Sequence, residues 1–314
     1  MYLVTGGAGF IGSNIVRRLT AMNVPVRIID DFSTGKRENL EGLTDVELIE
    51  GTLLDSVKLK QALTGVDYVI HQGAIPSVPR SIADPIGSNE ANVTATLKLL
   101  DSASRAGIKR FVYAASSSAY GDTAVMPKVE TMTANPLSPY AVSKYAGELY
   151  VKIFAEIYNL PAVSLRYFNI FGPYQDPGSE YAAVIPKFIN LMLKGESPVI
   201  YGDGEQSRDF THIDNAVEAN LLACTSEKVG RGEVINVACG ERITLNELVG
   251  SLNEILGTDI KPVYTSAVPG DVKHSLADIS KANELLDYEV KVDFKEGLKR
   301  TVKWFKSISE GSSS

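Results

Sequence analysis

The chain has 314 residues, of which 44% are hydrophobic and 22% charged, and this is enough to bury the core of one large domain or two coupled ones. A net charge of −7 argues against nucleic acid and anionic membranes as partners, and no apolar run approaches the ~20 residues of a membrane span. Two cysteines exclude a disulfide scaffold, and because the N-terminus carries no leader pattern we expect a cytoplasmic protein.

The first half of the chain alternates short β-branched apolar runs with helical patterns. In chain order, we expect strands at 2–5, 26–30, 46–50, 67–72, 110–115 and 162–167, and helices at 12–22, 56–63, 84–106 and 140–158. Such alternation predicts an α/β fold with a Rossmann-type, doubly wound parallel sheet. The wholly apolar character of several of these strands suits a sheet covered on both faces.

After Asn169 the regular alternation of strand and helix patterns ends, and a stretch rich in Gly, Pro and Asp follows. We expect a strand at 199–201 and helices at 185–193, 211–223, 244–256, from 280, and 294–305. We therefore predict a Rossmann domain of residues 1–168 plus about 210–237, and a smaller C-terminal α/β lobe of about 169–209 plus 238–308. The last residues, 309–314, are expected to be a disordered tail.

A glycine-rich turn follows the first strand directly. Gly6, Gly9 and Gly12 have the spacing Gly-x-x-Gly-x-x-Gly between a strand and a helix. This arrangement permits a tight turn and close approach of the backbone to a pyrophosphate at a helix N-terminus. A plain flexible turn is the alternative, but the strand before it and the helix after it favour a dinucleotide site.

Two carboxylates, Asp30 and Asp31, end the second strand, eighteen residues after Gly12. A carboxylate here accepts hydrogen bonds from a ribose diol and repels a 2′-phosphate, so NAD is favoured over NADP. Lys36 and Arg37, just beyond, leave some allowance for NADP, and one of the aspartates can instead cap a turn.

Tyr140 and Lys144 are four residues apart, so on a helix they share one face. An ammonium beside a phenol favours phenolate, and we therefore expect Lys144 to lower the pKa of Tyr140. Ser116, Ser117 and Ser118 end the strand at 110–115, where ligands bind in open α/β sheets.

Together, in this order, these motifs resemble the extended branch of the short-chain dehydrogenase/reductase superfamily. The segments Arg166–Asn169, Ser207–Phe210 and Pro269–Asp271 are similar to those of UDP-hexose 4-epimerases of the UDP-glucose 4-epimerase type. The resemblance implies an isomerase with bound NAD that acts on a UDP-sugar through a transient 4-keto sugar, and a homodimer. It implies no metal.

The resemblance also implies site residues. Catalysis would rest on Tyr140 as base, Ser116 as hydrogen-bond donor to the reacting oxygen, and Lys144. Cofactor contacts would come from Gly6, Gly9, Phe10, Ile11, Gly12, Asp30, Asp31, Ser33, Thr34, Gly35, Thr52, Leu53, Gln72, Ala74, Tyr140, Lys144 and Tyr167. Substrate contacts would come from Ser77, Ser116, Ser117, Ser118, Tyr140, Asn169, Gln175, Val184, Tyr201, Arg208, Asp271 and Ser275.

Departures from the family pattern bear on chemistry and substrate. Related 4,6-dehydratases carry Asp-Glu where this chain has Ser117 and Ser118, and decarboxylases have Glu in place of Ser118, so elimination and decarboxylation lack their carboxylates. Ser275 replaces the bulky Tyr of enzymes restricted to glucose and galactose, which predicts room for an N-acetyl group.

Two other positions lack the family's usual ligands. Thr52 and Leu53 stand where Asp-Ile is usual near the adenine, so Asp55 or backbone groups would take over that contact. Val268 stands where a second diphosphate Arg is usual, and Lys273 is a candidate substitute.

Two alternative functions stay open on the sequence alone. One is another nucleotide-sugar enzyme, such as a UDP-glucuronate 4-epimerase. The other is a non-enzymatic NAD-sensing regulatory protein on the same fold.

Overall fold

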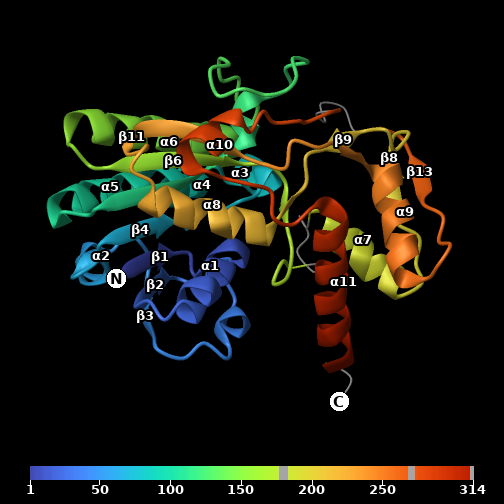
Figure 1. Ribbon diagram of the computed structural model, residues 1–314, viewed down its shortest axis with the longest axis horizontal. Helices are drawn as coiled ribbons and strands as arrows, with labels where there is room; N and C mark the ends of the chain where they lie inside the picture. Colours follow the sequence, from blue (N-terminus) through green and yellow to red (C-terminus); the bar gives the residue numbers. More distant parts are fainter. Residues whose placement is uncertain (177–182, 268–272, 312–314) are drawn as a thin grey trace.

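A computed structural model describes residues 1–176, 183–267 and 273–311, with side chains to residue 309. Figure 1 shows a layered α/β domain that contains the N-terminus, and beside it a smaller lobe that ends in the C-terminal helix. Asp271 lies outside the described residues.

Seven parallel strands form the central sheet, in the order β11-β6-β5-β4-β1-β2-β3. The strands are β1 (Tyr2–Thr5), β2 (Val26–Asp30), β3 (Val46–Glu50), β4 (Tyr68–His71), β5 (Arg110–Ser116), β6 (Ala162–Tyr167) and β11 (Arg231–Val237). The predicted Rossmann-type fold is confirmed. Strand β11 was not predicted as a strand, and its register shifts between Arg231 and Glu233, which breaks the alternation that marks a strand.

Helices cover both faces of the sheet (Figure 1). The helices α1 (Phe10–Ala21), α8 (Ile213–Thr225) and α10 (Ser280–Leu286) share one apolar core, and α2 (Ser56–Leu63), α5 (Ala95–Ala106) and α6 (Pro139–Ile157) share the other. Helix α10 therefore packs with the Rossmann core, although the predicted boundaries assign it to the lobe.

The single helix expected at 84–106 is divided. Helices α3 (Val78–Ala83) and α4 (Pro85–Asn89) precede a π-helical turn, η2 (Glu90–Thr94), which leads into α5. Within that turn Asn92 is buried, and its side chain bonds both backbone groups of Ile75 and the hydroxyl of Ser143. The wider turn, a common feature near functional sites, thus lets Asn92 link three segments.

The lobe has a core of its own, formed mainly by α7 (Val184–Leu193), α9 (Leu245–Leu256) and α11 (Phe294–Gly311). Short strand pairs complete it: β8 (Val199–Tyr201) with β13 (Val263–Thr265), and β9 (Ser207–Arg208) with β12 (Ile243–Thr244). The helix expected at 211–223 starts later, because β10 (Thr211–His212) pairs with β7 (Ile170–Phe171).

The C-terminal helix is longer than expected. Because α11 reaches Gly311, the prediction of a disordered tail from residue 309 is wrong for its first three residues. No helix in the described part of the chain is long and apolar enough to span a bilayer.

Candidate active site

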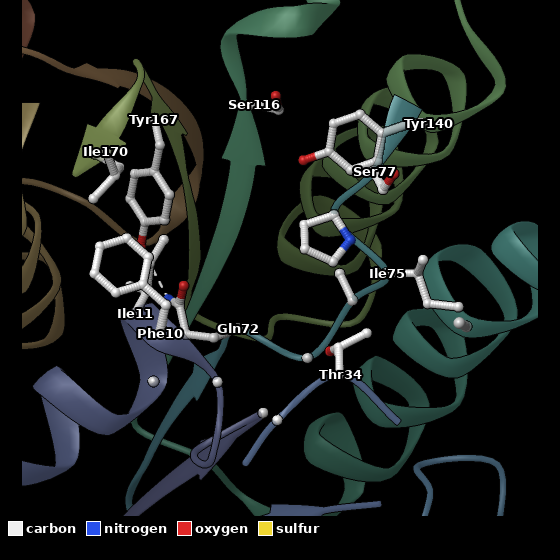
Figure 2. A pocket seen from close by; sticks show the side chains of 18 of the residues that line it. Phe10, Ile11, Thr34, Gln72, Ile75, Ser77, Ser116, Tyr140, Tyr167 and Ile170 are labelled. Carbon is white, nitrogen blue, oxygen red and sulfur yellow. Dashed lines mark hydrogen bonds between the residues drawn. The ribbon is translucent and has the colours of Figure 1, made fainter. Parts of the chain in front are cut away.

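One large cavity, of about 1120 Å³, opens at the carboxyl ends of the central strands and extends to the lobe. Figure 2 shows side chains that project into it from the glycine-rich turn, from β5 and from α6. Because parallel strands end at the same edge, loops far apart in the sequence meet here.

The glycine-rich turn forms one wall of this cavity. Gly6 has a φ of +64°, and a Cβ atom added at Gly12 would overlap the carbonyl oxygen of Gly6. The nitrogens of Gly9 and Ser13 bond the oxygens of Gly6 and Gly9, respectively. The N-terminus of α1 is thus brought close against the end of β1, which is the geometry that an anionic pyrophosphate needs.

Asp30 lies at the base of the loop that follows β2. Its two carboxylate oxygens accept hydrogen bonds from the backbone nitrogens of Ala8 and Phe32, each at 2.8 Å. Burial raises the pKa of this carboxyl group, and the two N–H donors oppose the shift. Asp31 is exposed and accepts from the nitrogen of Ser33 at 2.9 Å, so the turn cap considered for one aspartate is present at both.

Tyr167 is fixed on the opposite side of the cavity from Tyr140 (Figure 2). Its hydroxyl accepts from Nε2 of Gln72 at 2.9 Å and from Nδ2 of Asn220 at 2.7 Å. Phe10 and Ile11 lie beside Tyr167 and Gln72 and supply apolar surface to the cavity.

Tyr140 lies in the first turn of α6, whose N-terminus is defined by the cap residue Ser138 and by Pro139. The nitrogen of Tyr140 donates to Ser81 Oγ of α3 at 3.0 Å, which ties this turn to the neighbouring helix. Its side chain is half-buried and lines the cavity together with that of Ser116 at the end of β5. Ser116 Oγ in turn accepts the hydroxyl of Ser118 at 2.8 Å.

Lys144 lies one turn further along α6 and is buried beneath the cavity. Its Nζ stands 4.4 Å from the ring centre of Tyr113, and the Tyr113 hydroxyl donates to its carbonyl at 3.2 Å. Burial lowers the pKa of Lys144 to about 7. The same cause raises the pKa of Tyr140, and the nearby Ser116 hydroxyl only partly offsets this rise. The predicted lowering of the Tyr140 pKa by Lys144 is therefore not seen in this cavity.

His71 is held as a neutral residue behind the site. Its Nδ1 and Nε2 face the hydroxyls of Thr5 and Thr96 at 2.6 and 2.8 Å, and burial lowers its pKa to about 3. A structural role for His71 follows. Among the described residues no cluster of His, Cys, Asp and Glu could hold a metal ion.

The end of the cavity nearest the lobe is polar. Asn169, with a φ of +39°, donates from Nδ2 to the oxygen of Asp209 at 3.0 Å and to Ser275 Oγ at 3.3 Å. Arg208 lines the cavity and donates to the carbonyls of Ser207 and Lys273. Its neighbour Asp209 is buried and accepts hydrogen bonds from the backbone nitrogens of Cys239, Gly240 and Ala277.

Gln175 adds an acceptor to this end. Its Oε1 is buried and finds no hydrogen-bond donor in the described part of the chain, although the residue lines the cavity. A buried acceptor without a donor is costly, so a donor supplied by a ligand would satisfy it.

Most of the predicted site residues do line the cavity. For the cofactor these are Gly6, Gly9, Phe10, Ile11, Gly12, Asp30, Asp31, Ser33, Thr34, Gly35, Thr52, Leu53, Gln72, Ala74, Tyr140 and Tyr167. For the substrate these are Ser77, Ser116, Ser117, Ser118, Tyr140, Asn169, Gln175, Arg208 and Ser275.

Four predicted contacts lie elsewhere, and one of them is Lys144, which is buried beneath the cavity. Val184 packs against the lobe core and Tyr201 ends β8, and neither is among the residues that line the cavity. The carboxylate of Asp55, the candidate adenine contact, instead caps α2 through Val57 and Lys58.

Several cavity residues were missed by sequence reasoning. They include Arg80, Tyr120, Lys128, Tyr174 and Asp176. They belong to no recognisable motif and reach the cavity only through the fold. Lys36 and Asp176, for example, form an ion pair of 2.9 Å that joins the loop after β2 to the segment after β7.

The chain belongs to the NAD dependent epimerase/dehydratase family, whose model matches residues 2–238. It is 46% identical to a UDP-N-acetylglucosamine 4-epimerase from Methanobrevibacter ruminantium, solved in complex with UDP-N-acetylmuramic acid, over 98% of each chain with a TM-score of 0.93. It is 39% identical to a UDP-glucose 4-epimerase from Thermotoga maritima, solved with UDP-glucose, over 98% of this chain and 99% of the other, with a TM-score of 0.92.

A third solved structure is more distant. It is a UDP-glucuronic acid 4-epimerase from Bacillus cereus in complex with UDP-glucuronic acid and NAD, 32% identical over 98% of this chain and 99% of the other, with a TM-score of 0.90. These comparisons confirm three predictions: the family, an enzyme of the nucleotide-sugar epimerase type, and NAD as the cofactor.

The described residues fit NAD. Gly6, Gly9 and Gly12 form a tight backbone turn beside α1, and any side chain at Gly12 would overlap the Gly6 carbonyl and distort that turn. Asp30 stands at the end of β2 for the ribose, and both of its oxygens keep lone pairs beyond the backbone donors.

We expect Gly12→Ala to weaken NAD binding by about tenfold or more, because the added methyl group overlaps the Gly6 carbonyl and must open the turn. Fluorescence titration with NADH measures the effect. Gly250→Ala is the matched control, since a Cβ at this position in α9 meets nothing within 4 Å. Equal NADH affinity of the two variants would contradict the assigned role of the turn.

Proposed function

We propose that this protein interconverts C4 epimers of a UDP-hexose, namely UDP-glucose with UDP-galactose and also UDP-N-acetylglucosamine with UDP-N-acetylgalactosamine. The observation that carries the proposal is that Tyr140, Ser116 and the glycine-rich turn share one cavity. The solved relatives described as 4-epimerases of UDP-glucose and of UDP-N-acetylglucosamine support both pairs.

In the proposed reaction, Tyr140 Oη removes the proton from the sugar 4-hydroxyl. Ser116 Oγ already accepts the Ser118 hydroxyl, so its own hydroxyl hydrogen is available to bond the reacting oxygen. NAD, when bound, supplies the hydride acceptor that takes the hydrogen of C4 and later returns it. Lys144 would bond the nicotinamide ribose.

The same residues explain how both epimers form. The 4-keto sugar turns about the phosphate linkage and presents its other face, and the proton returns from Tyr140. Asn169 and Arg208 would hold the diphosphate meanwhile, because a planar guanidinium matches phosphate oxygens. The unsatisfied Oε1 of Gln175 would accept a hydrogen bond from the sugar.

Tyr140→Phe is expected to lower kcat by about a thousandfold while the nucleotide sugar still binds, since general acid–base catalysis contributes roughly 10²–10⁴. A coupled assay with UDP-galactose measures turnover, and calorimetry measures binding. Tyr158→Phe, half-exposed at the end of α6 and outside the cavity, is the control. Near-normal activity of Tyr140→Phe would exclude the proposed base.

Substrate size is the second point of the proposal. Ser275 lines the cavity and faces Asn169, and its small side chain leaves room for a substituent at C2 of the sugar. Ser117 and Ser118, where related enzymes use carboxylates, support epimerisation over elimination.

We expect Ser275→Tyr to reduce kcat/KM for UDP-N-acetylglucosamine by at least about tenfold and that for UDP-glucose by only a few-fold, because the ring would fill the space beside C2. Ser275→Ala separates bulk from hydrogen bonding, since it removes the hydroxyl and keeps the space. Unchanged turnover of UDP-N-acetylglucosamine by the tyrosine variant would refute the size argument.

A homodimer is the assembly that we propose. Helix α6 exposes Val142, Leu149, Ile153 and Ile157 along one side, with exposed fractions of 41–65%, and α4 beside it exposes Ile86. A continuous apolar face on two adjacent helices suits burial against a second copy. The cytoplasmic location stays a prediction, and the free thiols of Cys224 and Cys239 are compatible with it.

Sedimentation is expected to give about twice the mass of one chain. The double variant Leu149→Glu with Ile153→Glu should shift it to the monomer, because two charges would be buried in the interface. Val57→Glu, which adds one carboxylate at an exposed position of α2, is the control. A monomeric wild-type protein would disprove the homodimer.

A further inference from the structure

Lys128 is a buried cation in the wall of the cavity, and nothing in the proposed reaction uses it. Lys128 is only 2% exposed, and it lines the cavity together with Ser118, Tyr120 and Gly121. These neighbours follow Ser116 directly in the chain, so Lys128 belongs to the sugar end rather than to the glycine-rich end.

The backbone around Lys128 fixes this position. Its nitrogen donates to the oxygen of Leu276 at 2.7 Å, and its oxygen accepts from the nitrogen of Asp278 at 2.9 Å. These two bonds pair Lys128 with Ala277. Ser275, the residue that we propose sets the size of the pocket, lies two residues before Ala277. Lys128 and Ser275 therefore belong to the same wall of the cavity.

The ammonium of Lys128 has few partners. Its Nζ donates to the carbonyl of Thr123, which accounts for one of three donors. Within the described residues no carboxylate forms an ion pair with it, and Glu130 is used instead by the nitrogen of Asn236 at 2.8 Å. Asp122 favours the charged form from a greater distance, while burial lowers the pKa of Lys128.

Of the three other buried cations in the described residues, two have carboxylate partners, whereas Lys144 has none. Arg166 makes two hydrogen bonds, of 2.8 and 2.6 Å, with the carboxylate of Glu148, and Arg27 pairs with Glu47 at 2.7 Å. A buried charge without a counter-ion is destabilising. An anionic group that enters the cavity would provide the counter-ion that the protein does not.

We propose that Lys128 binds a carboxylate carried by the hexose of the nucleotide sugar, so that the cavity accepts acidic as well as neutral UDP-hexoses. This inference rests on the proposed function and extends its substrate class. Two positions can bring such a group to Lys128: C5, as in a uronate, or an acid joined to C3 through an ether. The shared chemistry is a carboxylate on the sugar ring, and the experiment separates the two.

The test compares Lys128 with Lys128→Met, which keeps the length and removes the charge. Both are placed in the Tyr140→Phe background so that the nucleotide sugars bind without being converted. Calorimetry then gives Kd for UDP-N-acetylglucosamine, UDP-glucuronate and UDP-N-acetylmuramate in the presence of NAD. Lys228→Met is the matched control, since Lys228 also donates to a carbonyl, that of Glu284, but lies outside the cavity.

We expect Lys128→Met to raise Kd for at least one acidic nucleotide by about tenfold or more, since a hydrogen bond to a buried charge is lost, and to change the neutral one less than threefold. A rise for UDP-glucuronate alone assigns the carboxylate at C5, and a rise for UDP-N-acetylmuramate alone assigns the ether at C3. Equal changes for all three would show that the lysine only supports the Thr123 loop and would overturn the proposal.

A second measurement uses the unaltered Lys128, in case the variant does not fold. In the Tyr140→Phe background, UDP-glucuronate should bind about as tightly as UDP-glucose, or UDP-N-acetylmuramate about as tightly as UDP-N-acetylglucosamine. More than tenfold weaker binding of both acidic nucleotides would also overturn the inference. Failure of the proposed function is distinguishable, because it would appear as no interconversion of neutral UDP-hexoses by the wild-type enzyme.

Discussion

The depth at which helix α6 packs onto strand β5 is the constraint on which the site depends. A Cβ atom at Gly147 would overlap the hydroxyl of Tyr113, so only glycine lets the helix come this close. The Tyr113 ring then lies 4.4 Å from Lys144 Nζ, and its hydroxyl bonds the Lys144 carbonyl. One aromatic side chain therefore sets both the position of the helix and that of its lysine, and Tyr140, one turn earlier, is brought to Ser116.

The same close packing has an electrostatic consequence. Lys144 is buried against Tyr113, and desolvation lowers the pKa of its ammonium to about 7 and raises the pKa of the Tyr140 phenol. Burial alone thus disfavours the phenolate that a base requires. The Ser116 hydroxyl lowers the pKa of the phenol, and any positive charge brought near the phenol would lower it further. The chemistry therefore depends on ligands that complete the site.

The sequence predicts best those features that are local. The glycine turn, Asp30 and the pair Tyr140 and Lys144 are recognisable because each needs fixed residue types at short spacing. Their order along the chain then indicates the sheet. Lys128 could not be found in this way, since its place in the cavity depends on pairing with Ala277, about 150 residues further along.

The elements that were missed have similar causes. Strand β11 contains a bulge that disturbs the alternation of its inward and outward side chains. Strands β7 and β10 have only two residues each and are defined by their pairing with each other. The π-helical turn before α5 is stabilised by contacts of Asn92 with residues outside the helix, whereas helical periodicity alone predicts a continuous element. Tertiary contacts, not propensity, decide these cases.

The catalytic residues and the residue that limits sugar size lie on different segments, and this affects how substrate preference can change. Tyr140, Ser116 and Lys144 all belong to the Rossmann layers, where the Tyr113 contact holds them. Ser275 lies on a segment that is attached to those layers through Lys128. Substitutions in that segment can alter the space and charge around the sugar without moving α6. Sugar preference is therefore free to vary while the geometry of proton removal stays the same.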